Sequence, residues 1–266
     1  MIVLFIVISR MCHFLMTKAT MNDEMQTYVA KICFGVCISC YSIYLIRKYK
    51  YHYLVGISRP SFSNSFLYIC PLYIVLLVDL SNAKNLNLWQ MAIPFAGVFF
   101  HAFAEELTIR GIILPTLIER KDISAQSIKK AIWISAIIFG LVHFISLSEY
   151  DFTSAITQVV YATIHGLFYG MLLIKGRNIY LISVSHALVN FFNRIKHIGQ
   201  PSMVVTDTND AQSLLLTIIL TIAIFSPLLC IAFVYIRKIN DEDASDVRAA
   251  LSYSGKSIAD TGENNS

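Results

Sequence analysis

The chain has 266 residues, of which 56% are hydrophobic and only 14% are charged. Soluble domains carry about 25% charged residues, so this composition excludes an ordinary soluble globular protein. Long, continuous apolar stretches argue against a transmembrane β-barrel, whose strands alternate in segments of about ten residues. The net charge of +4 is small, and we expect no nucleic-acid partner. The sequence therefore predicts an all-α, polytopic transmembrane helical bundle in a lipid bilayer.

Apolar segments give about seven or eight expected spans, several of them near the 20 or so residues that a membrane helix needs. Residues 1–26 form an N-terminal segment that we interpret as a marginal first span, because Arg10 interrupts it. Pro94 and Pro115 lie near the two ends of the longest segment, where proline predicts a helix start or a kink. The other expected spans cover residues 28–46, 65–80, 88–118, 131–147, 153–174, 179–198 and 211–236.

Basic residues occupy alternate loops. The segments 47–60, 119–130 and 175–177 and the residues after 236 carry clusters of lysine and arginine, whereas 81–87 and 199–210 hold a single lysine between them. The positive-inside rule places the first group in the cytoplasm. We therefore expect a transmembrane domain over residues 27–238. The tail at 239–266 is acidic at first and then rich in Ser, Gly and Asn, which predicts disorder on the cytoplasmic side.

Ionisable residues are concentrated within the longest apolar segment. Charges at membrane depth are costly, so His101, Glu105, Glu106 and Arg110 are candidates for function. Glu106 and Arg110 are four residues apart and can pair along one helix face. Glu105 points about 100° away from Glu106, and His101 lies on the same face as Glu105. The alternative interpretation of this cluster is a structural ion-pair network that holds helices together.

Two further motifs follow on later segments. Phe139 and His143 are four residues apart, as are His186 and Asn190, whereas His165 is more simply explained as a structural residue. A carboxylate and an imidazole can polarise a water molecule. A second imidazole and an amide can donate hydrogen bonds to the oxygen that becomes negative when water attacks a peptide carbonyl. The combination predicts amide hydrolysis without a covalent intermediate.

Over roughly residues 90–195 these motifs resemble the CPBP (Abi) family of intramembrane proteases, which includes the type II CAAX prenyl endopeptidases and bacteriocin-processing relatives. The family pattern of EExxxR, FxxxH and HxxxN occurs here in the same order. Ile109 stands where the family often has an aromatic residue, and His101 and His165 have no place in the pattern.

The resemblance implies a role for each matching residue. Glu105 and His143 would activate the water, and His186 and Asn190 would form the oxyanion site. Glu106 and Arg110, the supporting pair, would hold the geometry of the first motif.

Metal dependence stays open at this point. Glu105, His143 and His186 could form a His₂Glu zinc site, or they could act directly as base and hydrogen-bond donor. Asn190 is a poor zinc ligand one turn from His186, which favours a site with no cofactor and no metal.

Three functions compete for a membrane protein of this kind. An intramembrane endopeptidase acting on a membrane-delivered peptide or protein, in bacteriocin maturation or self-immunity at a bacterial cell membrane, accounts for every motif. A non-catalytic scaffold or regulator with the protease fold has no need of Glu105 or His186. A transporter would show paired repeats with broken helices, and the sequence has none.

Overall fold

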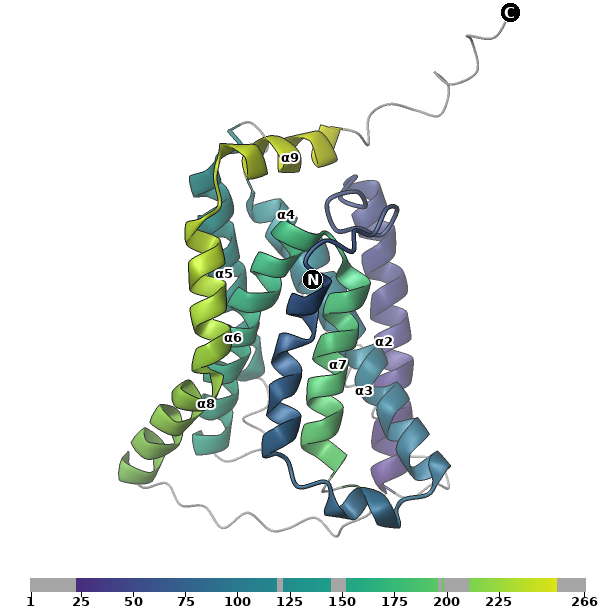
Figure 1. Cartoon of the computed structure of the whole chain (residues 1–266). Coiled ribbons are helices and arrows are strands. Elements are labelled where there is room, and N and C mark those ends of the chain that lie inside the picture. The colour runs from purple at the N-terminus through teal and green to yellow at the C-terminus, as the bar shows by residue number, and fades with distance from the viewer. Residues whose placement is uncertain (1–22, 119–121, 145–151, 196–197, 199–210, 253–266) are drawn as a thin grey trace, which may run out of the picture.

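The computed structural model describes residues 23–118, 122–144, 152–195, 198 and 211–252, and in this part of the chain the regular structure is entirely helical. The molecule is a bundle of roughly antiparallel helices (Figure 1), which confirms the predicted all-α fold. The α-helices are α2 (Asp23–Lys48), α3 (Leu88–Thr108), α4 (Leu114–Leu117), α5 (Ala125–Val142), α6 (Phe152–Gly176), α7 (Ile179–Ile195), α8 (Ala211–Arg237) and α9 (Asp241–Ser252).

Five helical stretches are long and apolar enough to cross a membrane: Glu24–Lys48, Leu88–Leu117, Ala125–Val142, Phe152–Gly176 and Gln212–Arg237. The helix α7 has 17 residues and is shorter than these. The expected span over 65–80 is not one α-helix, because it forms the 3-10 helices η1 (Ser65–Tyr68) and η2 (Cys70–Leu77), followed by η3 (Ser81–Asn85). Most of the expected N-terminal span lies outside the described residues.

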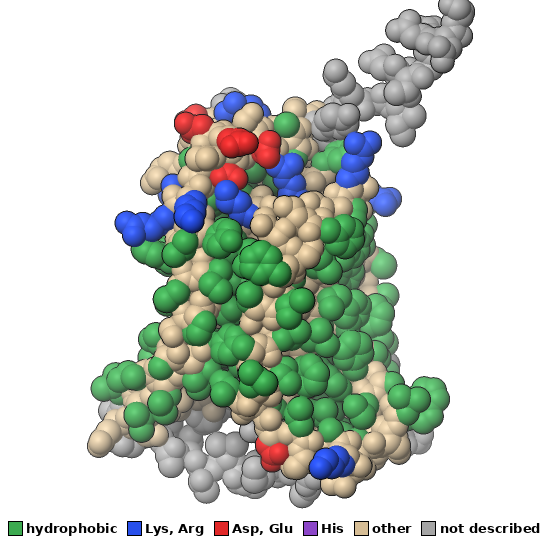
Figure 2. Space-filling view, viewed as in Figure 1, with side chains coloured by type: hydrophobic (Ala, Val, Ile, Leu, Met, Phe, Trp, Pro, Cys, Tyr) green, Lys and Arg blue, Asp and Glu red, His purple; other side chains and the backbone are tan. Residues whose placement is uncertain are grey.

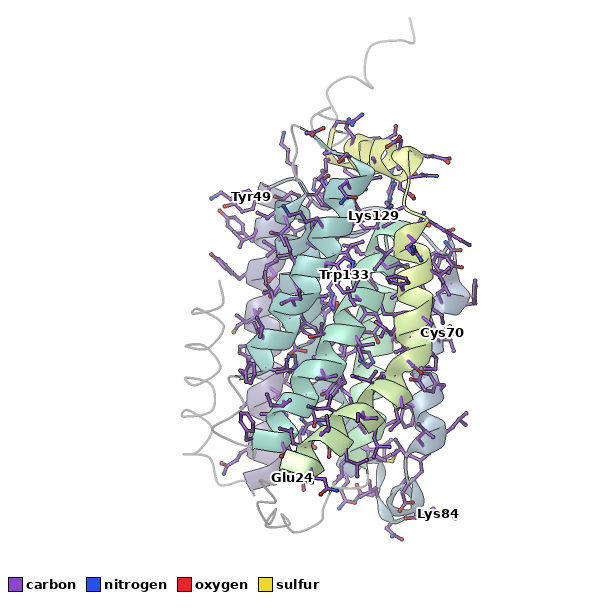
Figure 3. All side chains as sticks on the ribbon, turned by 90° about the vertical axis from the view of Figure 1, so that its left-hand side faces the viewer. Glu24, Tyr49, Cys70, Lys84, Lys129 and Trp133 are labelled. Atoms are coloured by element: carbon purple, nitrogen blue, oxygen red, sulfur yellow. The ribbon has the colours of Figure 1, made fainter. Side chains whose placement is uncertain are left out.

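The basic segments gather at one end of the bundle, as their alternation predicts. Figure 2 shows lysine and arginine side chains clustered at that end above a broad hydrophobic band. In Figure 3, Tyr49 and Lys129 lie toward this end and Glu24 and Lys84 toward the other. A hydrogen bond from the Lys129 ammonium to the backbone oxygen of Arg237 (3.2 Å) joins two of the basic segments directly. We call this region the basic end.

The prediction of a disordered tail is wrong for the residues of α9, which lies across the basic end (Figure 1). A reciprocal capping box starts the helix, because Asn240 and Asp243 each accept a hydrogen bond from the other's backbone N–H. Asp243 also pairs with Lys175 at 2.7 Å, and Asp246 pairs with Arg177 at 3.1 Å. On its inner face α9 buries Ala244, Val247 and Ala250.

The helix that carries both glutamates changes pitch after Thr108. Residues Ile109–Ile113 form a π-helical turn, η4, in which the N–H of Leu114 bonds to the carbonyl of Ile109 five residues earlier. Pro115 explains this turn, because proline has no N–H and its ring would clash with the carbonyl of Gly111 in a regular α-helix. Pro115 then occupies the first turn of α4, where the missing donor costs little.

Close contacts between helices fix the positions of the helices around the site. A Cβ atom on Gly35 of α2 would lie 2.4 Å from the backbone oxygen of Phe100 on α3. A Cβ atom on Gly166 of α6 would lie 2.8 Å from the backbone of Ala136 on α5. Only glycine allows such approaches, which are typical of helix pairs in membranes. The contacts hold α3 and α5, which carry the first two motifs, at fixed positions.

Candidate active site

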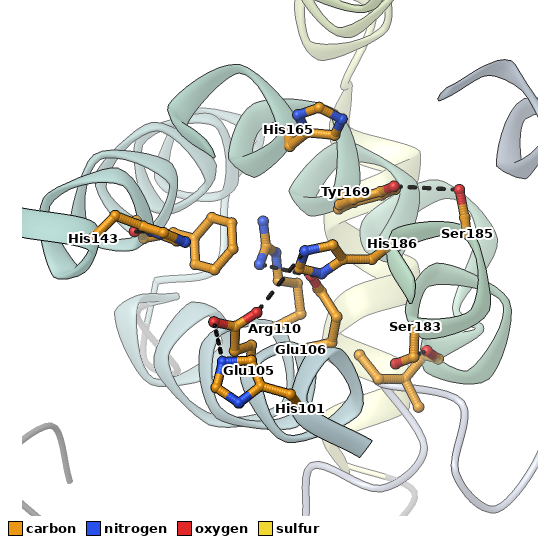
Figure 4. Close-up of polar contacts among 12 residues, drawn as sticks. His101, Glu105, Glu106, Arg110, His143, His165, Tyr169, Ser183, Ser185 and His186 are labelled. Atoms are coloured by element: carbon orange, nitrogen blue, oxygen red, sulfur yellow. Dashed lines mark hydrogen bonds and ion pairs between the residues drawn. The ribbon is translucent and has the colours of Figure 1, made fainter. Parts of the chain in front are cut away.

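Side chains from three motifs converge inside the bundle (Figure 4). Glu105 and Glu106 come from the last turn of α3, Arg110 from the π turn, and His186 from the middle of α7. His143 caps the C-terminus of α5. The structure therefore places residues that are about 80 positions apart in the chain within hydrogen-bonding distance of one another.

Glu106 is the buried centre of this cluster. Its Oε1 atom lies 3.1 Å from the Nη1 atom of Arg110, and both side chains are 0% exposed. The pairing predicted from their spacing is therefore present. The same oxygen lies 2.7 Å from Nδ1 of His186, a contact between α3 and α7 that the sequence did not predict. An ionised carboxylate can only accept, so the Nδ1 atom of His186 carries the proton of that hydrogen bond.

Aromatic rings enclose the guanidinium of Arg110. Its Cζ atom lies 4.3 Å from the ring centroid of Phe139 on α5 and 5.9 Å from that of Tyr169 on α6. Cation–π attraction contributes about 2 kcal/mol when the partners are desolvated, as they are here. Together with the Glu106 carboxylate, these rings compensate for burying a permanent positive charge.

Glu105 differs from its neighbour in exposure, since 14% of its side chain remains accessible. Its Oε1 atom lies 3.4 Å from Nε2 of His101, one turn earlier on α3. Its Oε2 atom lies 3.9 Å from Nε2 of His186. That second separation is too long for a direct hydrogen bond, and one water molecule can bond to both atoms across it.

His143 is half-buried beside the cluster. Its Nδ1 atom lies 2.8 Å from the backbone oxygen of Phe139. A carbonyl oxygen only accepts, so this ring nitrogen carries a proton, and in a neutral ring the lone pair is on Nε2. The ring also meets the edge of Phe139 at a centroid distance of 4.9 Å. The local backbone thus sets the tautomer of His143.

Asn190 is half-buried on α7, one turn beyond His186. The ring contacts Phe103–Tyr180 and Phe95–Phe191 show that α3 and α7 run antiparallel. This register places Asn190 near the level of Phe95, closer to the start of α3 than His101 and on the side of the cluster away from the basic end. No hydrogen bond joins Asn190 to the other site residues among those that the structure describes.

Three neighbours of the site lie outside the family pattern. His101 was a candidate because it is ionisable at membrane depth and lies one turn from Glu105, but the family pattern gives it no role. His165 is 3% exposed on α6 and donates from Nδ1 to the backbone oxygen of Tyr161 at 3.0 Å. Tyr169 lies beside His186 with a ring-centroid distance of 5.7 Å. Nothing in its sequence context distinguishes Tyr169 from the other tyrosines of the chain.

The positions of these side chains also bear on whether the site could bind a metal ion. Within the described ranges, no three His, Cys, Asp or Glu side chains form a group that could hold a metal. Glu105 and His186 approach each other at 3.9 Å, and the Nδ1 atoms of His143 and His186 are engaged in hydrogen bonds, so either imidazole would ligate a metal through its Nε2 atom. The metal dependence of the site stays a prediction.

Comparison with known proteins adds an independent observation. Residues 87–192 match the family model described as "Type II CAAX prenyl endopeptidase Rce1-like". The matched region begins at the N-terminus of α3 and ends within α7, so it contains all three motifs. No curated protein and no solved structure matches the chain.

Proposed function

We propose that the protein is an intramembrane endopeptidase with its reaction centre at Glu105, a proposal supported by the match of residues 87–192 to the type II CAAX prenyl endopeptidase Rce1-like family model. The observation that carries the proposal is the contrast between the two adjacent carboxylates. Glu106 is wholly buried and paired, whereas Glu105 keeps an accessible face between two imidazoles. A structural ion-pair network accounts for Glu106 but gives no reason for Glu105.

In the proposed reaction, Glu105 and His143 activate the attacking water. Glu105 takes the proton as the water oxygen attacks the peptide carbonyl, and His143 presents its Nε2 lone pair to the same water. The proton held by Glu105 then passes to the leaving amine, so the carboxylate is regenerated. Holding water and base in one place supplies part of the rate enhancement through positioning.

His186 and Asn190 would stabilise the oxyanion that forms in this step. The Nδ1–H of His186 is directed to Glu106, so the Nε2 atom can donate only when the ring carries both protons.

The family match and the surroundings of the site support a proposal for the substrate class. A reaction centre between membrane-spanning helices favours a peptide or protein delivered through the bilayer, such as a prenylated C-terminal motif or a small exported peptide. We further propose a bacterial cell membrane and a part in bacteriocin maturation or self-immunity, supported only by analogy with relatives. We propose that catalysis needs no metal.

The test is cleavage of an internally quenched farnesylated peptide ending in a CAAX sequence, by purified protein in liposomes. We expect one internal cut, mapped by mass spectrometry, that persists after extensive chelation. Activity that disappears with chelation and returns with stoichiometric Zn²⁺ would contradict the metal-free mechanism. Folded protein that cuts neither this peptide nor an unprenylated apolar control would favour a scaffold role.

The orientation is a separate proposal, that the basic end faces the cytoplasm. Gln126 is exposed on the first turn of α5, on the same helix end as Lys129 at the basic end, and Asn85 is exposed next to Lys84, which Figure 3 shows at the opposite end. In a variant lacking its six cysteines, Gln126→Cys should react with an impermeant maleimide only after the cells are opened, and Asn85→Cys should react in intact cells. Equal labelling of both positions in intact cells would contradict this orientation.

A further inference from the structure

Tyr169 lies outside the three motifs, yet it contacts both the buried ion pair and the central histidine. Its side chain is 0% exposed, and its ring lies 5.7 Å from the ring of His186 with an interplanar angle of 33°. The same ring lies beneath the guanidinium of Arg110. One residue of α6 therefore touches groups on α7 and on the π turn.

The hydroxyl of Tyr169 makes a second connection to α7. Its Oη atom lies 3.2 Å from Oγ of Ser185, which is also buried (Figure 4). A buried hydroxyl without a hydrogen-bond partner lowers stability by about 1–3 kcal/mol, so the hydrogen bond between these two hydroxyls stabilises the fold. This side-chain hydrogen bond links α6 to α7.

Ser185 precedes His186, and neighbouring side chains leave a helix about 100° apart. Fixing Ser185 against α6 therefore fixes the rotation of α7 about its own axis, and with it the direction in which His186 points. The tilted ring of Tyr169 then limits rotation of the imidazole about its Cβ–Cγ bond. The hydrogen bond from Nδ1 to Glu106 and the ring of Phe139, at a centroid distance of 6.0 Å, restrict the same rotation from other sides.

The support for Tyr169 continues behind it. His165, one turn earlier on α6, lies 5.7 Å from the Tyr169 ring, and Phe225 of α8 meets His165 edge-on at 5.1 Å. Close packing of three rings in sequence gives Tyr169 little room to move away from His186. This packing also gives a structural role to His165, which the family pattern leaves unexplained.

We infer that Tyr169, through its hydrogen bond to Ser185 and its ring contact with His186, is a positioning residue that holds the Nε2 atom of His186 toward the reacting carbonyl. The inference rests on the proposed function, because it assumes that His186 acts on the substrate. Tyr169 itself touches no reacting atom. Substitution of Tyr169 should therefore lower kcat more than it changes KM, because a misdirected donor stabilises the transition state less while substrate binding is largely kept.

The experiment compares Tyr169→Phe, Ser185→Ala and the double variant with Ser183→Ala as the matched control. Ser183 is buried on the same helix, but its hydroxyl bonds to the backbone oxygen of Ile179 within α7. On the quenched farnesylated peptide, we expect each single variant to lower kcat about tenfold with KM within about twofold. The double variant should fall no further, because both changes break one interaction. Ser183→Ala should leave kcat and KM near the wild-type values.

A second measurement separates this inference from the proposed function. In protein labelled with ¹⁵N-histidine, the hydrogen-bonded Nδ1 of His186 should give one sharp signal in the wild type and in Ser183→Ala. In Tyr169→Phe and Ser185→Ala it should shift or broaden. A wild-type protein that cleaves nothing would overturn the proposed function, while this signal would still decide whether Tyr169 orients His186. Unchanged ring signals and unchanged kcat in both variants, whatever happens to the melting temperature, would overturn the inference.

Discussion

Glu105→Gln is expected to abolish cleavage while leaving the fold intact. The amide keeps the shape of the carboxylate but has no basic oxygen, so the attacking water loses its proton acceptor. General-base catalysis supplies about 10²–10⁴ in rate, and the loss should lie at the upper end of that range because the base stands in a largely dry site. Turnover of the quenched farnesylated peptide measures the loss. Glu105 is partly exposed and its ion-pair contacts are long, so the melting temperature should move by less than about 3 °C.

The adjacent glutamate provides the matched control for this result. Glu106→Gln makes the same chemical change one residue away, but it removes the charge that faces buried Arg110 and His186. We expect Glu106→Gln to lower stability by about 3–5 kcal/mol, since it leaves an uncompensated buried cation. If the two variants lost stability equally, or if Glu105→Gln kept wild-type turnover, the roles assigned to the two carboxylates would be wrong.

Arg110→Ala should be among the most destabilising single changes in the chain. It leaves the carboxylate of Glu106 without its ionic partner at 0% exposure, which typically costs about 3–5 kcal/mol. It also empties the space between the rings of Phe139 and Tyr169, and an unfilled cavity adds to the loss. Unfolding in detergent can be followed through the fluorescence of the two tryptophans. Lower yield of folded protein and loss of activity should accompany the change.

A double variant distinguishes charge from packing. In Glu106→Gln with Arg110→Met, no charge is left unpaired and the methionine refills the space between the rings, so more than half of the lost stability should return. Activity should stay low, because the Nδ1 atom of His186 no longer has a carboxylate partner. A stability of Arg110→Ala equal to that of the wild type would mean that Arg110 is solvated, against the burial described above.

The parts of the site that the sequence predicted are those fixed by spacing along one helix. Glu106 and Arg110 pair because four residues return a helix to the same face. The gathering of the basic segments at one end also follows from sequence alone, because alternate loops of a bundle share an end. The bond from Glu106 to His186 could not be predicted in this way, since it depends on how α3 and α7 are rotated against each other.

Two predictions made from composition were wrong, because local hydrogen bonds and proline determine the structure in those segments. The acidic, Ser-rich tail has the composition of a disordered segment, but the capping box at Asn240 and the pairing of Asp243 with Lys175 stabilise the helix α9. The apolar run at 65–80 has the composition of a span, but Pro71 stands near the start of η2 and the run forms 3-10 helices. Tyr169 was missed because its role comes entirely from tertiary contacts.

The π turn at Ile109–Ile113 has a consequence for protein engineering. In a regular α-helix the direction of each side chain is fixed relative to all the others. Rotating such a helix so that the glutamates face α7 would therefore also fix the directions of Leu114 and Ile118. The wider turn separates the two directions, so that Glu105 and Glu106 face α7 while Leu114 and Ile118 are buried in the core. Grafting the two glutamates onto a straight designed helix would lose this freedom. A working transplant would need the five-residue turn and Pro115 as well.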